Sequence, residues 1–324
     1  HRTTENHPYA IVWLDDASRK ILSGGVLEHY RYMLSYPKCP KCKSNESVVK
    51  YGKRHNESGA KQTYFCKKCE CRFTPKDGFW KMRFSPEVIT AALDLYYKGL
   101  SLRKIKDHLY QFHNVEVSHT SILRWVRRYT KLTRKYTMNF KPKIKGNIHA
   151  DEIFLEKKED DRKYLYFFDA IDSETRFIWG FLSVYRDGDS AKELFRKIKH
   201  NGEGYPEKVV HDGFHPYEKA FRKYFYHKSE EVRLVKFEDK VNNNIVERLQ
   251  GTIRERNKVQ RGLSSYPSSS DMMDGFTVYY NFLRPHMSLE GKTPAECADI
   301  EIDFGRNRWL GLIKKFFFHN FYPN

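Results

Sequence analysis

The chain has 324 residues, and its 59 Lys and Arg against 41 Asp and Glu give a formal net charge of +18. This length suits two or three domains, and the charge favours a polyanionic partner. The sequence shows no signal peptide and no apolar run near the ~20 residues that cross a membrane. We therefore expect no membrane partner, and we expect a cytoplasmic protein associated with the DNA of the nucleoid.

The positive charge is concentrated between residues 37 and 147. This segment holds 26 Lys and Arg residues against 8 Asp and Glu, a net charge of +18, so the rest of the chain is about neutral. Lys and Arg side chains release counterions from a phosphate backbone, which makes nucleic acid the expected partner. A solvated basic surface is the alternative, but folded motifs occupy the segment.

A segment near the start of the given sequence is similar to a later segment of the chain. Residues 9–22 resemble residues 164–180, and both read as a strand, an acidic turn and a second strand. Asp15 and Asp16 in the first copy have no third carboxylate in a matching frame nearby. We interpret residues 1–36 as a hairpin-like extension whose role the sequence does not indicate, and not as a second active site.

Two Cys-x-x-Cys motifs predict a zinc ribbon over residues 37–78. Each motif lies on a predicted turn, and 23 residues separate the two. Four thiolates at this spacing suit one tetrahedral, structural Zn²⁺, and so small a unit needs the metal to fold. Cys71 is a candidate to replace Cys69, Cys297 is expected in the core, and four unliganded buried thiols are the alternative. The expected zinc ligands are Cys39, Cys42, Cys66 and Cys69.

Residues 84–140 predict three short helices and, with them, a helix-turn-helix DNA-binding domain. Ser85, Ser101 and Ser118 are the expected N-caps. Polar residues at the start of the third helix are expected to meet bases, and its arginines to meet phosphates. A three-helix bundle with a solvated face is the alternative. The candidate DNA contacts are His119, Thr120, Ser121, Arg124, Arg127 and Arg128.

Residues 147–300 predict an α/β catalytic domain, followed by an aromatic tail over residues 301–324. The order is three strands, helix, strand, helix, strand, helix, which is that of an RNase H-like, integrase-type core. The strands are expected near 147–155, 163–171, 175–184, 208–211 and 232–236, and the helices near 190–200, 214–226 and 244–259.

Three carboxylates form the candidate active site. Asp151 lies in the first predicted strand, Asp212 ends the fourth, and Glu247 lies in the last helix. Carboxylates placed in this way can converge on two divalent metal ions about 3.5–4 Å apart, the arrangement that phosphodiester chemistry uses. Strand, turn and capping roles are the alternatives for each residue alone. Further carboxylates nearby fit strand and turn roles better and are left out of the site: Glu152, Asp169 and Asp172.

The helix of Glu247 also carries a basic row. Arg254 and Lys258 follow Glu247 at helical spacing and share its face with Gln250 and Gly251. Basic side chains beside a metal site can hold the DNA strand that is cut. An exposed basic helix without that role is the alternative.

In these residues the chain resembles a DDE transposase of a prokaryotic insertion sequence, of the kind found in the insertion sequence 6 family and its relatives. The resemblance covers about residues 37–300, and residues 1–36 and the aromatic tail depart from the family pattern. The segments that carry the resemblance are His149–Glu152, Tyr164–Phe167, His211–Gly213, Asn243–Arg248 and Tyr280–Glu296.

The resemblance implies metal-dependent cleavage of DNA 3′ ends and strand transfer. Asp151, Asp212 and Glu247 would hold two Mg²⁺ or Mn²⁺ ions per active site. The zinc ribbon and helix-turn-helix would recognise terminal inverted repeats, and the protein would act as a homodimer or larger assembly on these ends and on double-stranded target DNA. The alternatives are a DNA-binding protein that has lost catalysis and a stand-alone metal-dependent nuclease.

Overall fold

The computed structural model of the chain describes residues 36–56, 59–157, 164–234, 244–260, 263 and 265–321. Contacts divide the chain into two units, with the boundary between residues 76 and 77. The hairpin predicted over residues 1–36, including Asp15 and Asp16, lies outside the described residues apart from Tyr36. No helix within the described ranges has the length and apolar character that a membrane crossing requires.

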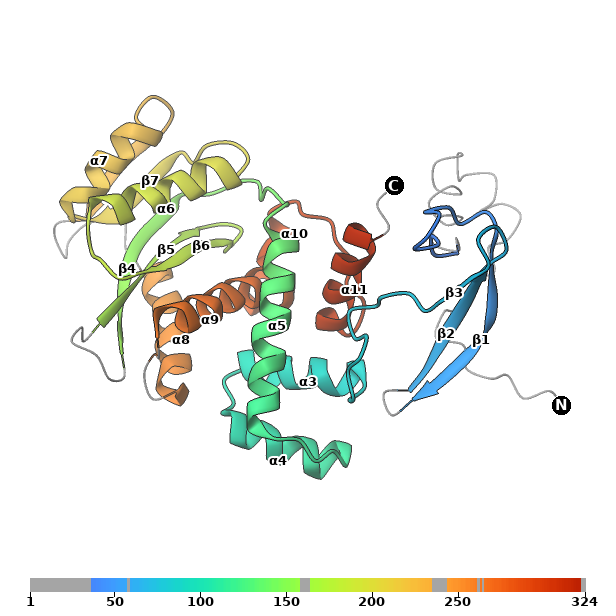
Figure 1. Cartoon of the computed structure of the whole chain (residues 1–324). Coiled ribbons are helices and arrows are strands. Elements are labelled where there is room, and N and C mark those ends of the chain that lie inside the picture. The colour runs from blue at the N-terminus through green and yellow to red at the C-terminus, as the bar shows by residue number, and fades with distance from the viewer. Residues whose placement is uncertain are drawn as a thin grey trace. The chain divides into compact units, whose positions relative to one another are not determined.

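The first unit is built on a small antiparallel sheet (Figure 1). In sheet order its strands are β1 (Val48–Asn56), β2 (Gly59–Cys66) and β3 (Cys71–Phe73). Cys39, Val48 and Cys66 are buried together, and the rings of Tyr64 and Phe73 stack beside them with centres 6.0 Å apart. So few apolar side chains bury too little surface to hold a fold together without a further crosslink.

The second unit begins with three helices, each capped by a serine. They are α3 (Pro86–Tyr97), α4 (Leu102–His113) and α5 (His119–Thr137). The hydroxyl oxygens of Ser85, Ser101 and Ser118 accept hydrogen bonds of 3.2–3.3 Å from the backbone N–H three residues later. These contacts confirm the predicted N-caps, because each satisfies an N–H group that the first helical turn leaves unpaired. The assignment as a helix-turn-helix stays a prediction.

A five-stranded mixed sheet forms the centre of the second unit. The sheet order is β6-β5-β4-β7-β8, with β4 antiparallel to β5 and parallel to β7. The strands are β4 (Ile148–Glu156), β5 (Tyr164–Asp172), β6 (Ile178–Ser183), β7 (Lys208–Asp212) and β8 (Glu230–Leu234). Three antiparallel strands extended by two parallel ones, with helices between the later strands, are the predicted RNase H-like arrangement.

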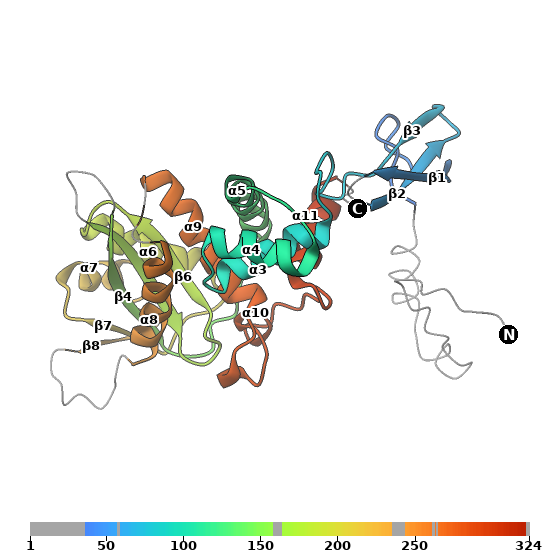
Figure 2. The same cartoon turned by 90° about the horizontal axis from the view of Figure 1, so that it is seen from below.

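Helices cover both faces of this sheet (Figures 1 and 2). The views show α6 and α7 on one side and α8 and α9 on the other, and α8 contacts β4 and β5. The bounds of these helices are α6 (Gly188–Asn201), α7 (His215–Tyr224), α8 (Asn244–Gln260) and α9 (Tyr266–Val278). A strand such as β4 is therefore enclosed on both of its faces.

The third strand begins later than its predicted start at residue 175. Asp172 explains the delay, because its carboxylate accepts hydrogen bonds of 2.8–3.1 Å from four backbone N–H groups, those of Lys145, Gly146, Glu174 and Thr175. Arg176 then adopts a φ of 61° before the strand resumes at Ile178. The turn role predicted for Asp172 is confirmed by these contacts.

The chain continues through short helices to a final long one. Their bounds are η1 (Tyr279–Leu283), η2 (Met287–Leu289), α10 (Pro294–Cys297) and α11 (Arg308–Phe321). Asn281 in η1 seals the edge of the sheet, because its side chain accepts a hydrogen bond from the Ile178 N–H at 2.9 Å and donates one to the Ile178 carbonyl at 2.8 Å. This pair gives an edge strand the partners that it lacks on its open side.

Helix α11 completes the core of the preceding helices. It packs against α3 and α5, and the Trp309 ring stacks on Tyr97 of α3 with centres 5.4 Å apart. One hydrophobic cluster consequently extends from Phe79 to Phe317. The segment predicted as an aromatic tail thus lies in part inside the fold, with Trp309, Leu312, Ile313 and Phe316 buried.

Gly275 allows α9 to approach α3 and α5. A Cβ atom at this position would lie 2.6 Å from Tyr97 Cζ and 2.7 Å from Thr130 Oγ1, and the hydroxyls of these two residues share a buried hydrogen bond of 2.6 Å. We expect Gly275→Ala to lower the free energy of unfolding by about 1–3 kcal/mol, because the packed hydroxyl pair has no space to move.

Denaturant unfolding measures this effect, and Gly251→Ala on α8 is the matched control. Among the described residues, no atom outside the adjacent residues and the nearby backbone of α8 lies within 4 Å of a Cβ at Gly251. That substitution is expected to be neutral or to stabilise by up to about 1 kcal/mol, since alanine is the better helix former. Equal effects of the two substitutions would contradict the packing explanation.

Candidate active site

The structure brings two of the three predicted carboxylates together. Asp151 lies on β4 and Asp212 ends β7, and the parallel pairing of these strands places Ala150 opposite His211. The third member of the cluster is Glu152: Asp151, Glu152 and Asp212 each offer an oxygen, and these oxygens all lie within 4.8 Å of one another. Three carboxylates so close repel one another unless a cation or a proton offsets their charge.

The position of Asp151 in this cluster raises the pKa of its carboxyl group. Burial and the negative charges of Asp212 and Glu152 raise its pKa to about 6, although the Glu152 N–H donates a hydrogen bond of 2.8 Å to its Oδ1. An acid with a raised pKa is one whose ionised form the fold disfavours. A bound cation would reverse that balance.

Asp169 lies opposite Asp151 across the β4–β5 pair and is fully buried. Its two carboxylate oxygens have no hydrogen-bond partner among the described residues. Burial, with the charge of Asp151 second, raises the pKa of Asp169 well above its usual range. The protonated carboxyl is therefore favoured at this position. Its place within β5 fits the strand role that the sequence predicts.

Glu152 is held from the opposite side of the sheet. Neighbouring side chains of a strand point to opposite faces, and Glu152 points toward α7. Its carboxylate accepts a hydrogen bond of 2.5 Å from Arg186 Nε and one of 2.8 Å from the Tyr217 hydroxyl. Tyr217 is fully buried, and burial raises the pKa of its hydroxyl well above the usual range, so it acts as a donor.

Arg186 links Glu152 to the turn that carries Asp212. Its guanidinium carbon lies 3.9 Å from the centre of the Phe214 ring, and the Phe214 N–H donates a hydrogen bond of 3.2 Å to Asp212 Oδ1. The His211 ring also contacts the backbone here, with Nδ1 2.6 Å from the Asp212 carbonyl. These contacts fix the turn after β7 and hence the direction of Asp212.

Glu247 lies outside the carboxylate cluster. It is exposed in the first turn of α8, and the described residues begin at Asn244 on that side. Gln250, one turn further along, is buried, and its side chain interacts with the Asp151 carboxyl and lowers its pKa. The helix that carries Glu247 therefore passes directly beside Asp151. Arg254 and Lys258 on the same helix are exposed.

Glu152 is the residue that sequence reasoning left out of the site. The available signal was the acidic pair Asp151-Glu152 inside a strand flanked by apolar residues. In a strand covered on both faces, each member of such a pair must find a buried partner. The partners of Glu152 are Arg186 and Tyr217, which lie far along the chain, so no sequence pattern around the strand indicates them.

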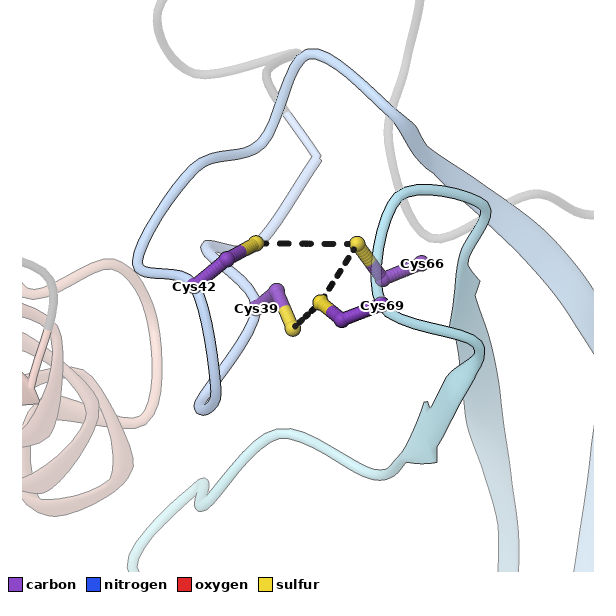
Figure 3. Close-up of side chains that lie close together, drawn as sticks. All are labelled: Cys39, Cys42, Cys66 and Cys69. Atoms are coloured by element: carbon purple, nitrogen blue, oxygen red, sulfur yellow. Dashed lines mark hydrogen bonds between the residues drawn. The ribbon is translucent and has the colours of Figure 1, made fainter.

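The four predicted zinc ligands lie together in the first unit (Figure 3). The Sγ–Sγ distances are 3.5 Å between Cys39 and Cys69, 3.7 Å between Cys42 and Cys66, and 3.3 Å between Cys66 and Cys69. The four sulfurs come from two tight turns. Lys43 and Glu70, which follow the second cysteine of each turn, have φ values of 61° and 50°.

This arrangement suits a soft cation. Burial disfavours a thiolate at Cys39, but hydrogen bonds from the backbone of Cys42 and Lys41 outweigh it and lower the pKa to about 6. Thiolate sulfur is the preferred ligand of structural zinc, and four such ligands make a closed tetrahedral site. Cys71 and Cys297 stand outside the four-thiol group among the described residues. The structure thus has Cys69, and not Cys71, as the fourth member of the thiol group.

The predicted DNA contacts on α5 lie near its N-terminus. His119, Thr120, Arg124 and Arg128 are exposed and Ser121 is half-buried. Arg127 is exposed too, and its Nη2 donates a hydrogen bond of 2.7 Å to Ser268 Oγ of α9. The helix start thus presents polar and basic groups, and DNA contact by these six residues stays a prediction.

Comparison with solved structures finds similarity to integrase catalytic cores. Two solved structures similar to the chain are integrase catalytic core domains, each aligned with 47% of this chain. The HTLV-2 core in complex with magnesium has a TM-score of 0.36 at 12% identity over 95% of its own length. The BIV core has a TM-score of 0.34 at 12% identity over 92% of its length. No curated protein matches the chain.

A family model covers the catalytic segment. Residues 145–286 match the model of a DDE domain, the catalytic domain of transposases. The matched segment contains β4 to β8, α6 to α9 and all three predicted carboxylates. Residues 145–286 thus match a DDE transposase domain, and this match indicates a polynucleotidyl transferase.

Proposed function

We propose that this chain cleaves DNA at the 3′ ends of an insertion sequence and joins those ends to a target. The observation that carries the proposal is the meeting of Asp151 and Asp212 with a further carboxylate on adjacent strands of a DDE domain. Asp151, Asp212 and Glu247 are the proposed ligands, and Glu152 is a positioning residue.

The residues fit divalent metal ions. Carboxylate oxygens are the ligands that Mg²⁺ and Mn²⁺ prefer, and the raised pKa of Asp151 reflects negative charge that a cation offsets. Asp151, Asp212 and Glu247 would hold two such ions, which would supply activation of an attacking water or 3′-hydroxyl and stabilisation of the leaving oxygen. Arg254 and Lys258 would hold the phosphate backbone of the strand being cut.

Glu247 and Glu152 are expected to differ in their contribution. Glu247 is exposed and can turn toward the site, whereas Arg186 and Tyr217 already occupy both oxygens of Glu152. We expect Glu247→Gln to reduce cleavage by about 100- to 1000-fold, as loss of a metal ligand costs several kcal/mol in the transition state. Glu152→Gln should reduce cleavage by about tenfold, in line with loss of an outer contact to a ligand.

The measurement is cleavage of a labelled duplex at saturating Mg²⁺, with Glu255→Gln, exposed on α8, as the control. The control should cleave like the unchanged protein. The reverse order, with Glu152→Gln the more damaging, would make Glu152 the third ligand and assign Glu247 to the helix surface.

The N-terminal elements complete the proposal. The unit with the four cysteines acts as a zinc ribbon with one structural Zn²⁺, and residues 84–140 act as a helix-turn-helix. Together they recognise terminal inverted repeats, and a homodimer or larger assembly holds paired ends beside double-stranded target DNA of the nucleoid. The basic charge of residues 37–147 supports this role.

A direct assay tests the function. The purified chain is mixed with labelled duplex from inverted repeats flanking its gene, with a target plasmid, and with Mg²⁺ or Mn²⁺. Cleavage at the 3′ end followed by joining supports the proposal. Cleavage without joining would indicate a stand-alone nuclease, and specific binding without cleavage would indicate a DNA-binding protein that has lost catalysis.

A further inference from the structure

A cavity of about 500 Å³ lies in the second unit, where α4, α5, α8 and α9 come together. Its lining includes Arg103, His119, Arg127 and Arg256, one or more from each of the first three helices. None of Asp151, Glu152 and Asp212 lines it. The cavity is therefore a place distinct from the carboxylate cluster.

Arg256 is a buried cation that faces this cavity. Its exposed fraction is 5%, its guanidinium carbon lies 3.9 Å from the centre of the Tyr96 ring, and Nη1 donates to the Leu100 carbonyl at 3.3 Å. Nε and Nη2 are buried and have no hydrogen-bond partner in the part of the chain that the structure describes. A buried charge is costly without a counter-charge, so these two donors are suited to an anionic acceptor.

The N-terminus of one helix borders the same cavity. Ser101, the N-cap of α4, lines it together with Leu102 and Arg103 of the first turn, whereas α5 lines it with one face that runs from His119 to Thr130. Helix N-termini carry partial positive charge and N–H groups that favour phosphate. The N-terminus of α4 and the buried guanidinium thus independently favour an anionic ligand.

The other lining residues suit a ligand larger than phosphate. Asp271 is the one acidic side chain in the lining, and its carboxylate pairs with Lys131 at 3.1 Å. The lining also has apolar side chains, those of Leu123, Val126 and Met272, beside the hydroxyl groups of Thr130, Ser268 and Ser269. A space lined by basic, hydroxyl and apolar side chains matches a nucleotide, in which a charged phosphate is joined to a flat apolar-faced base.

We propose that this cavity binds one unpaired nucleotide of a DNA strand. The phosphate lies between Arg256 and the N-terminus of α4, and the base packs on Leu123, Val126 and Met272. The inference rests on the proposed function only for the choice of DNA as the ligand. His119 and Arg127 support that choice, because they belong both to this lining and to the predicted DNA contacts. A nucleotide must leave the base stack to enter the cavity.

The test is binding of the full chain to labelled DNA without Mg²⁺ or Mn²⁺, followed by fluorescence anisotropy. A duplex with one unpaired nucleotide should bind about tenfold more tightly than the fully paired duplex, since one stacked base accounts for such a preference. Arg256→Gln and Arg103→Gln should each reduce that preference. Because Arg103 is exposed, its variant does not depend on the core tolerating a change.

Lys106→Gln is the matched control, since Lys106 is exposed on α4 and does not line the cavity. It should keep the preference. Equal binding of the two duplexes by the unchanged protein, or a preference that survives both arginine substitutions, would overturn the proposal. Because the assay needs no catalysis, a chain that fails to cleave DNA can still pass it.

Thermal unfolding distinguishes binding of a DNA strand in the cavity from binding of a free ligand there. A deoxynucleoside 5′-monophosphate should raise the Tm of the unchanged protein and not that of Arg256→Gln, whereas the nucleoside without phosphate should have no effect. Stabilisation by inorganic phosphate or free nucleotide, combined with no preference for the unpaired duplex, would mean that the cavity serves a free ligand and would refute the DNA assignment.

Discussion

Asp151→Asn and Asp212→Asn are each expected to reduce DNA cleavage by about 1000-fold or more. Each change removes an anionic oxygen from the place where β4 and β7 bring the carboxylates together. Several kcal/mol of transition-state stabilisation would depend on the ions proposed to bind there, and each 1.36 kcal/mol corresponds to a factor of about ten in rate. Cleavage of a labelled duplex in Mg²⁺ and in Mn²⁺ measures the loss.

The fold of the Asp151 variant should be intact. Burial and neighbouring negative charge raise the pKa of Asp151 to about 6, so the carboxylate that forms above that pH destabilises the folded chain relative to the unfolded chain. Neutral asparagine removes this repulsion, and the Tm of the metal-free protein near pH 8 should therefore stay equal or rise.

Asp189→Asn provides the control, because Asp189 is an exposed acid at the start of α6 with a side chain that is 89% exposed. It should keep full activity and DNA binding. Substantial cleavage by Asp151→Asn or Asp212→Asn would remove these residues from the catalytic site.

Removing the metal from the four-cysteine site is expected to unfold the first unit. The apolar core of that unit is very small, and four thiols occupy its centre. Zinc binding at such a site contributes about 10–16 kcal/mol, which is more than the net folding stability of a domain of this size. We expect one zinc per chain by elemental analysis, and rapid proteolysis of residues 36–76 after chelation or in Cys66→Ser.

Cys71→Ser and Cys297→Ser are the controls for this prediction. Both cysteines lie outside the four-thiol group, so both variants should retain one zinc and resist proteolysis. Zinc loss from Cys71→Ser would show that Cys71 is a ligand after all. A unit that resists protease without metal would show that its apolar contacts suffice.

Local patterns predicted the elements that depend on nearby residues. The serine caps of α3, α4 and α5 and the strands β4, β5 and β7 follow from capping chemistry and apolar runs. The late start of β6 escaped prediction, because the Asp172 turn depends on amide groups from two separate segments. Turn chemistry of this kind joins residues far apart in sequence.

Only those residues of the candidate site whose positions follow from the order of the strands could be predicted from the sequence. Asp151 and Asp212 lie on adjacent strands, and the fold class alone places the ends of such strands together. Glu152 depends on Tyr217, 65 residues further along the chain, and no local pattern indicates that contact. Glu247 lies one helical turn before Gln250, the residue that reaches Asp151, and its third-ligand role stays a prediction.

The position of α11 has a consequence for how the protein is made. Helix α3 ends 212 residues, and helix α5 172 residues, before Trp309 in α11, the helix that packs on both. At about 5–20 residues per second, the ribosome needs roughly 10–40 s to span these intervals. Throughout this time the apolar surfaces that α11 covers on α3 and α5 lack this native partner. We therefore expect chains that stop before α11 to be captured by chaperones or degraded, so that a stable protein requires translation through α11.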